Sequence, residues 1–285
     1  MTMTQEDTLK DLSTKYARLS KGHKRIADYV MGNYDKVIFM TVHELSTTVG
    51  ISESTVVRFA HSLGYDGYPS FQKSLQESIK NRLTTLQRLE YMNTGQQEGN
   101  VITKIMHSDI RNIQDTITNM SLDRMKDIAD TIHQAEHVYI FGLRSSRILA
   151  DYLGFYLKFM HSSVTVLPQG VNDTYDELIN IQSKDVMIAI SFPRYSTHTI
   201  TAIEHLKTKR VEVIGITDSY QSPIARIADK FILANFNVDT FVDSLTAPMS
   251  LINALIVTMS LGCKGNMEKR FNELEELWKD QGTYI

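Results

Sequence analysis

Five short apolar runs, separated for the most part by helical patterns, place the strongest constraint on how this chain folds. The runs cover residues 137–142, 163–167, 185–191, 211–217 and 230–233. The helical patterns between them cover residues 145–160, 172–182, 197–209 and 223–229. Apolar runs of this length are typical of strands that are buried on both faces of a parallel sheet. The repetition of strand and helix therefore predicts a doubly wound α/β domain with right-handed crossovers.

The N-terminal part contains a different pattern, in which two short helices are joined by a glycine. Thr41 and Glu44 have the spacing of a capping box, in which the Thr41 hydroxyl accepts from the Glu44 amide and the Glu44 carboxylate accepts from the Thr41 amide. This helix ends at Gly50, because glycine adopts the left-handed C-terminal conformation most readily. Ser52 or Ser54 caps the next helix. The pattern predicts a helix-turn-helix within an all-α N-terminal domain.

The second of these helices, over residues 53–63, has a polar face whose chemistry suits DNA. It offers short hydrogen-bonding side chains and one arginine, which fit phosphate oxygens and base edges in a major groove. Basic residues from the neighbouring helices add contacts to phosphate. The predicted DNA-binding residues are Thr41, Ser52, Ser54, Thr55, Arg58, His61, Lys21, Lys24 and Lys73. In the alternative interpretation, this helical hairpin is only a packing unit.

Charge is distributed unevenly along the chain, which bears on a nucleic-acid partner. The whole chain has 30 Lys and Arg against 33 Asp and Glu, for a net charge of −3. Residues 18–90 hold ten basic and seven acidic side chains, so this stretch is mildly basic and the remainder is acidic. The low charge predicts weak non-specific DNA binding and a shallow dependence on salt for each subunit.

Length and composition indicate a two-domain, cytoplasmic protein. A chain of 285 residues has room for about two domains. Residues 91–100 are polar, contain two glycines and lack periodicity, so we expect a linker there, between domains over 1–90 and 101–285. The single cysteine, Cys263, excludes an internal disulfide, and the sequence contains no recognisable signal peptide or clean membrane span.

Polar residues follow three of the predicted strands, at the edge where a parallel sheet binds its ligands. The carboxyl ends of parallel strands converge on one crevice. Helix N-termini with serine hydroxyls, free amides and a nearby arginine predict a site for phosphate or carboxylate. The predicted ligand-binding residues are Gly142, Arg144, Ser145, Ser146, Ser191, Arg194, Tyr195, Ser196 and Thr217.

Four short motifs of the N-terminal part, followed by the α/β domain, carry a resemblance to a known family. They are Thr41-Val-His-Glu-Leu45, Gly50-Ile-Ser52, Ser54-Thr-Val-Val-Arg58 and Leu63-Gly64. This combination resembles the RpiR/MurR-type bacterial transcriptional regulators, whose second domain is a SIS (sugar isomerase) domain. The resemblance implies a DNA-binding regulator of sugar or sugar-acid metabolism, whose SIS domain binds a phosphosugar or another acidic effector and forms a homodimer or homotetramer. Since one helix-turn-helix makes few base contacts, we expect a two-fold symmetric operator.

The two ligand loops depart from the pattern of that family. Gly142, Ser145, Ser146, Ser191 and Ser196 match it by position. Arg144 replaces the second glycine of the first loop, and Pro193 and Arg194 replace a serine and a glycine of the second loop. We expect Arg144 and Arg194 to meet over the crevice and clamp a carboxylate or a phosphate. In the alternative interpretation, these arginines pair with acidic residues between 173 and 177 and order the loops, or they serve an oligomer interface.

A SIS-fold sugar-phosphate isomerase with a helical interaction module is the second hypothesis. An isomerase needs a base beside the carbonyl of its ligand. His198, Glu177 and Asp173 lie near the predicted loops, but none has a partner at a diagnostic spacing. The nine histidines do not combine with carboxylates at a metal-ligand spacing. The sequence therefore predicts a non-enzyme, with no catalytic residue, metal, cofactor or membrane partner.

Overall fold

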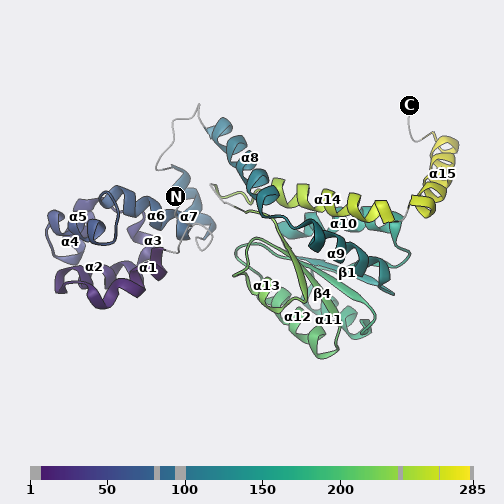
Figure 1. Cartoon of the computed structure of the whole chain (residues 1–285), viewed down its shortest axis with the longest axis horizontal. Coiled ribbons are helices and arrows are strands. Elements are labelled where there is room, and N and C mark those ends of the chain that lie inside the picture. The colour runs from purple at the N-terminus through teal and green to yellow at the C-terminus, as the bar shows by residue number, and fades with distance from the viewer. Residues whose placement is uncertain (1–7, 80–83, 94–100, 237–239, 263, 283–285) are drawn as a thin grey trace. The chain divides into compact units, whose positions relative to one another are not determined.

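A computed structural model of the chain describes residues 8–79, 84–93, 101–236, 240–262 and 264–282. The chain divides into two compact units, one of residues 1–101 with 238–242 and the other of residues 102–237 with 243–285. In Figure 1 the described part of the first unit consists of helices joined by loops, and the second unit contains the sheet. Among the described residues, no helix is long and apolar enough to cross a bilayer.

The first unit is a bundle of short helices. They are α1 (Thr8–Lys15), the 3-10 helix η1 (Tyr16–Arg18), α2 (Lys21–Gly32), α3 (Tyr34–Val37), α4 (Val42–Val49), α5 (Glu53–Ser62), α6 (Tyr68–Ile79) and α7 (Thr85–Asn93). The capping box of α4 is confirmed: Thr41 Oγ1 accepts from Glu44 N at 3.2 Å, and Glu44 Oε2 accepts from Thr41 N at 2.6 Å. Gly50 ends α4 with a φ of 68°, the left-handed conformation expected of it. The two short helices predicted from the sequence, α4 and α5, are therefore present.

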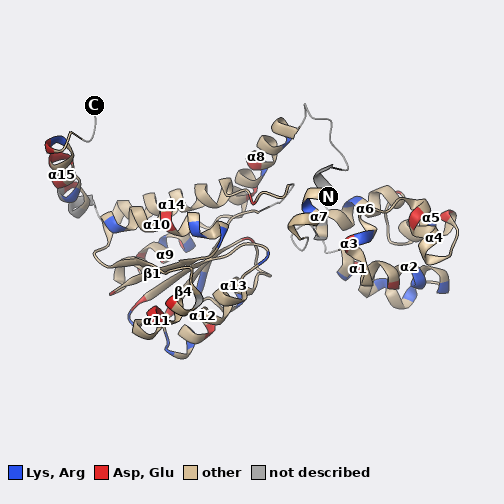
Figure 2. Cartoon of the chain, turned by 180° about the vertical axis from the view of Figure 1, so that it is seen from behind, with Lys and Arg blue, Asp and Glu red and all other residues tan. Residues whose placement is uncertain are grey.

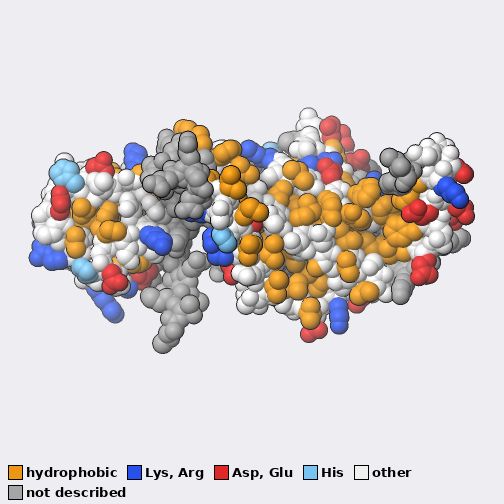
Figure 3. All heavy atoms as spheres, turned by 90° about the horizontal axis from the view of Figure 1, so that it is seen from above, with side chains coloured by type: hydrophobic (Ala, Val, Ile, Leu, Met, Phe, Trp, Pro, Cys, Tyr) orange, Lys and Arg blue, Asp and Glu red, His pale blue; other side chains and the backbone are white. Residues whose placement is uncertain are grey.

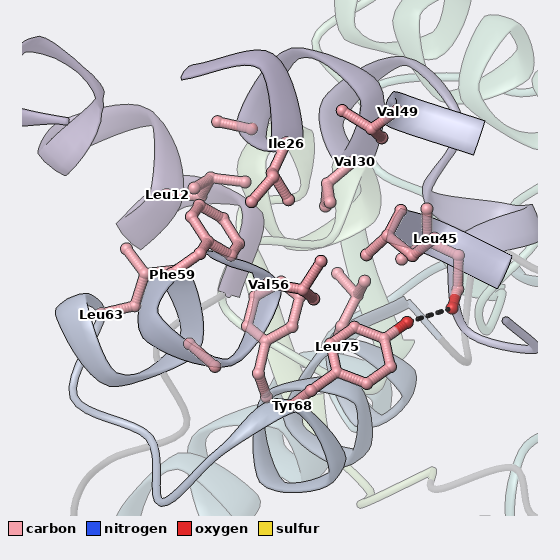
Figure 4. Close-up of a cluster of buried hydrophobic side chains, with 14 of the residues drawn as sticks. Leu12, Ile26, Val30, Leu45, Val49, Val56, Phe59, Leu63, Tyr68 and Leu75 are labelled. Carbon is pink, nitrogen blue, oxygen red and sulfur yellow. Dashed lines mark hydrogen bonds between the residues drawn. The ribbon is translucent and has the colours of Figure 1, made fainter. Parts of the chain in front are cut away.

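One apolar cluster holds these helices together (Figure 4). Its fully buried side chains include Leu12, Ile26, Val30, Leu45, Val56, Phe59, Phe71 and Leu75. The rings of Phe59 and Phe71 meet edge to face at 5.5 Å. Tyr68 is 2% exposed, and its hydroxyl donates to the Met40 carbonyl at 2.9 Å. Tyr68 is thus a packing residue of the core, and it ties α6 to the segment that follows α3.

The sequence pattern predicts a single helix from Pro69 to about residue 90, and this prediction is wrong. α6 ends at Ile79, and Thr84 begins a separate helix, α7. Thr84 Oγ1 accepts from Gln87 N at 3.3 Å, and Gln87 Oε1 accepts from Thr84 N at 2.9 Å. This second capping box stabilises a new helix start, which an apolar periodicity alone does not reveal.

Most of the predicted linker lies outside the described residues, and the stretch after it forms two helices. α7 includes the first three residues of the linker predicted over 91–100, and the others lie outside the described residues. The helical stretch over 101–135 consists of two helices, α8 (Val101–Asn119) and α9 (Leu122–Gln134). The second one starts independently because the Ser121 hydroxyl accepts from the Arg124 amide at 3.3 Å.

The second unit has the doubly wound α/β fold that the apolar runs predict. Its strands are β1 (Val138–Gly142), β2 (Val164–Val166), β3 (Val186–Ile190), β4 (Glu212–Thr217) and β5 (Lys230–Leu233). All neighbouring strands are parallel, in the order β2-β1-β3-β4-β5. The chain leaves β1 for one edge of the sheet and returns to β3 on the other side, so the winding direction reverses between β1 and β3. Ligands bind at this switch point in open α/β sheets.

Helices cover both faces of this sheet. The helices of the second unit are α8, α9, α10 (Ser145–Met160), α11 (Val171–Asn180), α12 (Thr197–Thr208), α13 (Pro223–Ile227), α14 (Thr246–Gly262) and α15 (Lys264–Asp280). Figure 1 shows α11, α12 and α13 on one face of the sheet and α9, α10 and α14 on the other. The central strands β1 and β3 are buried along their whole length, as strands between two helical layers must be.

Candidate functional site

A cleft lies at the carboxyl ends of β1 and β3, where the winding direction reverses. Its lining consists of Leu143, Arg144, Ser145, Ser146, Ser191, Phe192, Pro193, Arg194, Ser196, Thr199 and Asp243. The structure thus brings together six of the predicted ligand-binding residues, namely Arg144, Ser145, Ser146, Ser191, Arg194 and Ser196.

Two helices begin at this cleft. Ser145 is the first residue of α10, and Ser196 is the N-cap of α12, with a side chain that makes no capping bond. Helix N-termini leave backbone amides without intrahelical partners and carry the positive end of the helix dipole. Ser146 and Ser191 add hydroxyls that are only 6% and 5% exposed. This combination of amides and hydroxyls is suited to an anionic group.

Both arginines that line the cleft adopt conformations that favour glycine. Arg144 has a φ of 55° and a ψ of −126°, and Arg194 has a φ of 70°. Such conformations cost on the order of 1–3 kcal/mol for a residue with a side chain, and they persist only where the surroundings enforce them. These are also the two positions at which the resemblance leads us to expect glycine. The loops therefore keep a glycine-like backbone while each adds an exposed guanidinium group to the cleft.

Sequence reasoning missed two polar residues of the cleft. Thr199 lies in the first turn of α12 and is 1% exposed, and among the described residues its hydroxyl has no hydrogen-bond partner. Asp243 accepts a hydrogen bond from Ser145 Oγ at 2.9 Å, although 98 positions separate the two residues. A hydroxyl inside a helix carries no loop signal, and a contact over this sequence distance has no local signature. Only the position of Thr199, three residues after the N-cap Ser196, pointed to the same helix end.

The remaining three predicted ligand residues do not line the cleft. A Cβ on Gly142 would lie 2.5 Å from the Ser146 carbonyl oxygen, so glycine is needed for α10 to start this close to β1. Thr217 is fully buried and donates to Asp218 Oδ1 at 3.2 Å. Tyr195 donates to the same oxygen at 2.6 Å, and its burial, together with the Asp218 charge, raises the pKa of the Tyr195 hydroxyl far above its usual range. Gly142, Tyr195 and Thr217 therefore contribute to the structure around the cleft and not to its lining.

One candidate base of the isomerase hypothesis, His198, is exposed and lies outside the lining of the cleft. It lines a small neighbouring cavity that has both apolar and polar residues, among them Phe141, Gln169 and Thr174. In the part of the chain that the structure describes, no group of three or more His, Cys, Asp or Glu is arranged to hold a metal ion.

In the first unit, four of the predicted DNA-binding residues lie together near the start of α5 and form a largely exposed cluster. Ser52 Oγ lies 3.0 Å from Ser54 Oγ and 2.8 Å from Thr55 Oγ1. Arg58 Nε donates to the Ser54 carbonyl at 3.3 Å. The start of α2 lies against this cluster, since a Cβ on Gly22 would be 3.7 Å from Thr55 Cγ2. We call Ser52, Ser54, Thr55 and Arg58 the α5 cluster.

The α2 helix adds basic residues next to the α5 cluster. Figure 2 shows Lys and Arg along α2. Lys21 is the first residue of this helix, next to Gly22. Burial, followed by the charge of Arg58, lowers the pKa of His23. Lys24 lies over the Tyr16 ring, with its Nζ 5.4 Å from the ring centroid, so part of its charge is directed toward an aromatic face.

Three of the predicted DNA-binding residues stand apart from the α5 cluster. Thr41 is engaged in the capping box of α4. His61 and Lys73 are exposed on α5 and α6, and no contact described for the resolved side chains joins either one to the α5 cluster. A further contact lies beside the start of α5, where His43 Nδ1 is 2.7 Å from Glu53 Oε1.

The comparisons with known proteins agree with both units. Residues 6–82 match the helix-turn-helix domain of the rpiR family, and residues 131–258 match the SIS domain. The chain belongs to the RpiR family. The resemblance drawn from the four sequence motifs is therefore confirmed.

The relatives of this RpiR-family chain are similar over most of their length. An uncharacterized HTH-type transcriptional regulator of Clostridium perfringens is 25% identical over 224 residues, which cover 78% of this chain and 79% of that protein. An uncharacterized HTH-type transcriptional regulator of Haemophilus influenzae is 25% identical over 245 residues, which cover 81% of this chain and 80% of that protein.

Solved structures share the fold of this RpiR-family chain. The sugar isomerase domain of an RpiR transcription factor from Sphaerobacter thermophilus is 25% identical, with a TM-score of 0.60, and covers 62% of this chain and 99% of its own. The Vibrio vulnificus NanR protein, complexed with ManNAc-6P, is 20% identical, with a TM-score of 0.58, and covers 96% of this chain and 98% of its own.

Proposed function

We propose that this protein is a cytoplasmic DNA-binding transcriptional regulator of sugar or sugar-acid metabolism, controlled by a phosphosugar or another acidic small molecule bound in the cleft. The observation that carries the proposal is the cleft itself, where Arg144 and Arg194 join two helix N-termini and four serine hydroxyls. The names of the Clostridium and Haemophilus relatives support a role in transcription. The ManNAc-6P complex of the Vibrio NanR protein supports an acidic sugar ligand.

The acidic group of the effector binds at the hydroxyl end of the cleft, with the two arginines over it. Hydrogen bonds to a charged group contribute about 1.5–3 kcal/mol each. An arginine fork fits carboxylate and phosphate equally well, so the arginines define an acidic ligand without choosing between the two. Thr199 gains a partner when a ligand oxygen reaches its hydroxyl, which removes the cost of a buried, unpaired polar group.

The α5 cluster contacts DNA, with Lys21 and Lys24 of α2 adding phosphate contacts. Ser52 and Ser54 are short, polar and exposed, Thr55 is half-buried, and Arg58 is exposed and long enough to reach a base edge. His61, Lys73 and Thr41 complete the predicted contact set, although Thr41 acts mainly by starting α4. A two-fold symmetric operator follows if two helix-turn-helix units bind together.

In a homodimer or homotetramer, the helix-turn-helix units of two subunits bind to one operator. Apolar side chains gather on one face of the second unit (Figure 3). Among the described residues, the apolar side chains of α8, α10 and α14 that are at least 58% exposed are Ile102, Met106, Ile117, Ile148, Phe155, Val257 and Leu261. Soluble monomers rarely expose apolar patches larger than a few hundred Å². A subunit interface over this face explains why these side chains are outside the core.

A mobility-shift assay with the DNA upstream of the gene, with and without sugar phosphates and sugar acids, tests the function. We expect a shift at low salt and a change of the shift with one of these ligands. The absence of a shift with any upstream fragment would contradict the DNA-binding role. The same protein is assayed for isomerisation of each sugar phosphate, and turnover would favour the SIS-fold isomerase with a helical interaction module instead.

A further inference from the structure

We infer that the carboxylate of Asp243 competes with the acidic ligand for the Ser145 hydroxyl, and that displacement of Asp243 releases helix α8 from the rest of the second unit. The inference rests on the proposed function, because it takes an acidic ligand to bind in this cleft. It assigns a regulatory contact to a residue that lies outside both ligand loops. It also identifies α8 as the helix that responds to ligand binding in the cleft.

The competition follows from the chemistry of a single donor. Ser145 Oγ donates to Asp243 Oδ2 at 2.9 Å, and a serine hydroxyl has one proton to donate. Ser145 also begins α10, so its hydroxyl lies at the helix end best suited to an anion. A ligand phosphate or carboxylate that takes this proton must break the bond to Asp243. It also brings a second negative charge next to the carboxylate, which is unfavourable for both.

A second polar group in the cleft points to a ligand independently of Asp243. Thr199 is 1% exposed, lines the cleft, and has a hydroxyl without a hydrogen-bond partner in the described chain. A buried hydroxyl of this kind is unfavourable until something bonds to it. A ligand that reaches Thr199 therefore gains free energy that offsets the loss of the bond between Ser145 and Asp243.

The segment after Asp243 is tied to α8 through one carboxylate. Ser244 Oγ donates to Asp109 Oδ1 at 2.5 Å, and Thr246 Oγ1 donates to Asp109 Oδ2 at 3.1 Å. Asp109 lies on α8, and Ser244 is the residue next to Asp243. A displacement of Asp243 that moves its backbone also moves Ser244, and it then strains both bonds to Asp109.

Hydrogen bonds are prominent among the contacts that hold α8, so the release of α8 requires little free energy. The buried positions of α8 are the polar residues Ser108, Asn112 and Thr116, one turn apart. Asn235 N donates to Thr116 Oγ1 at 2.8 Å, and Asn235 Nδ2 donates to Asn112 Oδ1 at 3.1 Å. Such bonds contribute little net stability, because water replaces them when they break. A helix held in this way separates at lower cost than one that buries an apolar face.

A second set of contacts connects the cleft to α8. In sequence, α8 is also the helix of the second unit nearest to the helix-turn-helix unit. Phe192 lines the cleft, and its ring stacks on Phe236 at 4.8 Å, next to Asn235. α8 is the first helix of the second unit, so the chain runs from it, through residues 94–100, into the helix-turn-helix unit. Through both sets of contacts, ligand binding in the cleft affects α8, the helix nearest in sequence to the DNA-binding unit.

Calorimetry on the full-length protein tests the competition, with inorganic phosphate as the probe and chloride keeping the ionic strength constant. Asp243→Asn keeps an acceptor for Ser145 but removes the charge, so we expect it to bind phosphate about tenfold more tightly than the unmodified protein, within the range usual for coupling between sites. Asp130→Asn removes the same charge from an exposed position on α9 that does not line the cleft. Its phosphate affinity should stay within about twofold of the unmodified protein.

Hydrogen–deuterium exchange of the amides in residues 108–119 tests the release of α8. We expect saturating phosphate to increase this exchange in the unmodified protein. In Asp109→Asn, whose side chain holds Ser244 and Thr246 less tightly, exchange should already be high and should respond little to phosphate, while phosphate affinity is retained.

Three results would overturn the inference, and they separate it from the proposed function. Equal phosphate affinity in Asp243→Asn and the unmodified protein would exclude the competition. Tighter binding in Asp243→Asn without any change of exchange in α8 would exclude the release, and in both cases the acidic-ligand site would stand. Failure of phosphate to bind to any of the proteins would overturn the ligand site of the proposed function, and this inference with it.

Discussion

The two units each present groups that attract anions, but they do so in opposite ways. The α5 cluster is largely exposed, and its side chains bond to one another. The cleft holds a buried hydroxyl without a partner, Thr199, and two arginines in glycine-like conformations. Exposed, mutually bonded groups exchange their bonds easily for those of a large partner surface, whereas a strained and unsatisfied cleft is stabilised by a ligand that fits it. The contrast supports the proposal that the first unit binds DNA and the second a small acid.

The largest expected effect tests whether the two sites depend on separate cores. Phe59 is fully buried in the first unit, between Phe71 and His23. Phe59→Ala should lower the free energy of unfolding of the first unit by about 3–5 kcal/mol. Urea unfolding measures this loss, and a mobility shift should show weaker DNA binding. Phosphate affinity, measured by calorimetry, should be unchanged, and a parallel loss there would show that the two sites share one cooperative unit.

The next effect concerns the arginines of the cleft. Arg144→Ala and Arg194→Ala should each weaken phosphate binding by about 10- to 100-fold, the equivalent of one lost hydrogen bond to a charged group. Calorimetry on each variant measures the affinity. Undiminished affinity in both variants would mean that the arginines order the loops or serve an interface and do not clamp the ligand.

A glycine substitution separates the strain at Arg144 from its charge. Because the backbone there has a φ of 55°, Arg144→Gly should gain on the order of 1 kcal/mol in stability while losing phosphate affinity as the alanine variant does. Arg210→Gly is the matched control, since Arg210 has a φ of 61° and does not line the cleft. It should gain stability at unchanged affinity. A similar affinity loss in Arg210→Gly would show that the effect comes from overall charge.

Much of this architecture follows from local sequence patterns. The central strands stand out because strands buried on both faces need uninterrupted apolar runs, and the capping box marks the start of α4 within one residue. The loop residues of the cleft were predictable because parallel strands bring their carboxyl ends to one edge of the sheet. Local patterns therefore located the sheet, the helix-turn-helix and six residues of the cleft.

The other features of the cleft and of α8 depend on contacts between segments that are distant in sequence. Asp243 reaches Ser145 only through the tertiary fold, and Thr199 is buried by packing that no local pattern shows. Tyr195 and Thr217 have the side chains expected of a ligand site, but both bond to Asp218 instead. The polar residues on the buried side of α8 reverse the usual pattern, because their partners come from the segment around Asn235.

A smaller effect sharpens the role of the α5 cluster. Arg58→Ala should weaken operator binding by about 1–3 kcal/mol if Arg58 reads a base, and the loss should depend on the DNA sequence. Lys73→Ala should weaken binding to all sequences evenly and reduce the salt dependence, as for a phosphate contact. Competition mobility shifts with mutated operators measure both. If Arg58→Ala lowers the affinity for all DNA sequences equally, Arg58 contacts phosphate and does not read a base. Neither variant should change the affinity of the cleft for inorganic phosphate.

The smallest effect separates helix capping from DNA contact at Thr41. Thr41→Ala removes the hydroxyl that accepts from the Glu44 amide, and at neutral pH it should cost about 1 kcal/mol of the stability of the first unit. The amide and then the hydroxyl of Thr41 lower the pKa of Glu44 below its ordinary value of 4.5. The stabilisation that depends on the Glu44 charge is therefore present above that value and is lost as the pH falls through the lowered pKa.

Thermal unfolding at neutral pH and below pH 4.5 measures this dependence, and the gap between Thr41→Ala and the unmodified protein should narrow in acid. Thr41→Ser keeps the hydroxyl, so it should retain most of the stability at neutral pH. If Thr41 acts only as a cap, both variants should bind DNA normally at temperatures where the first unit is folded. A loss of DNA affinity in Thr41→Ala under those conditions, recovered in Thr41→Ser, would show that the same hydroxyl also contacts DNA.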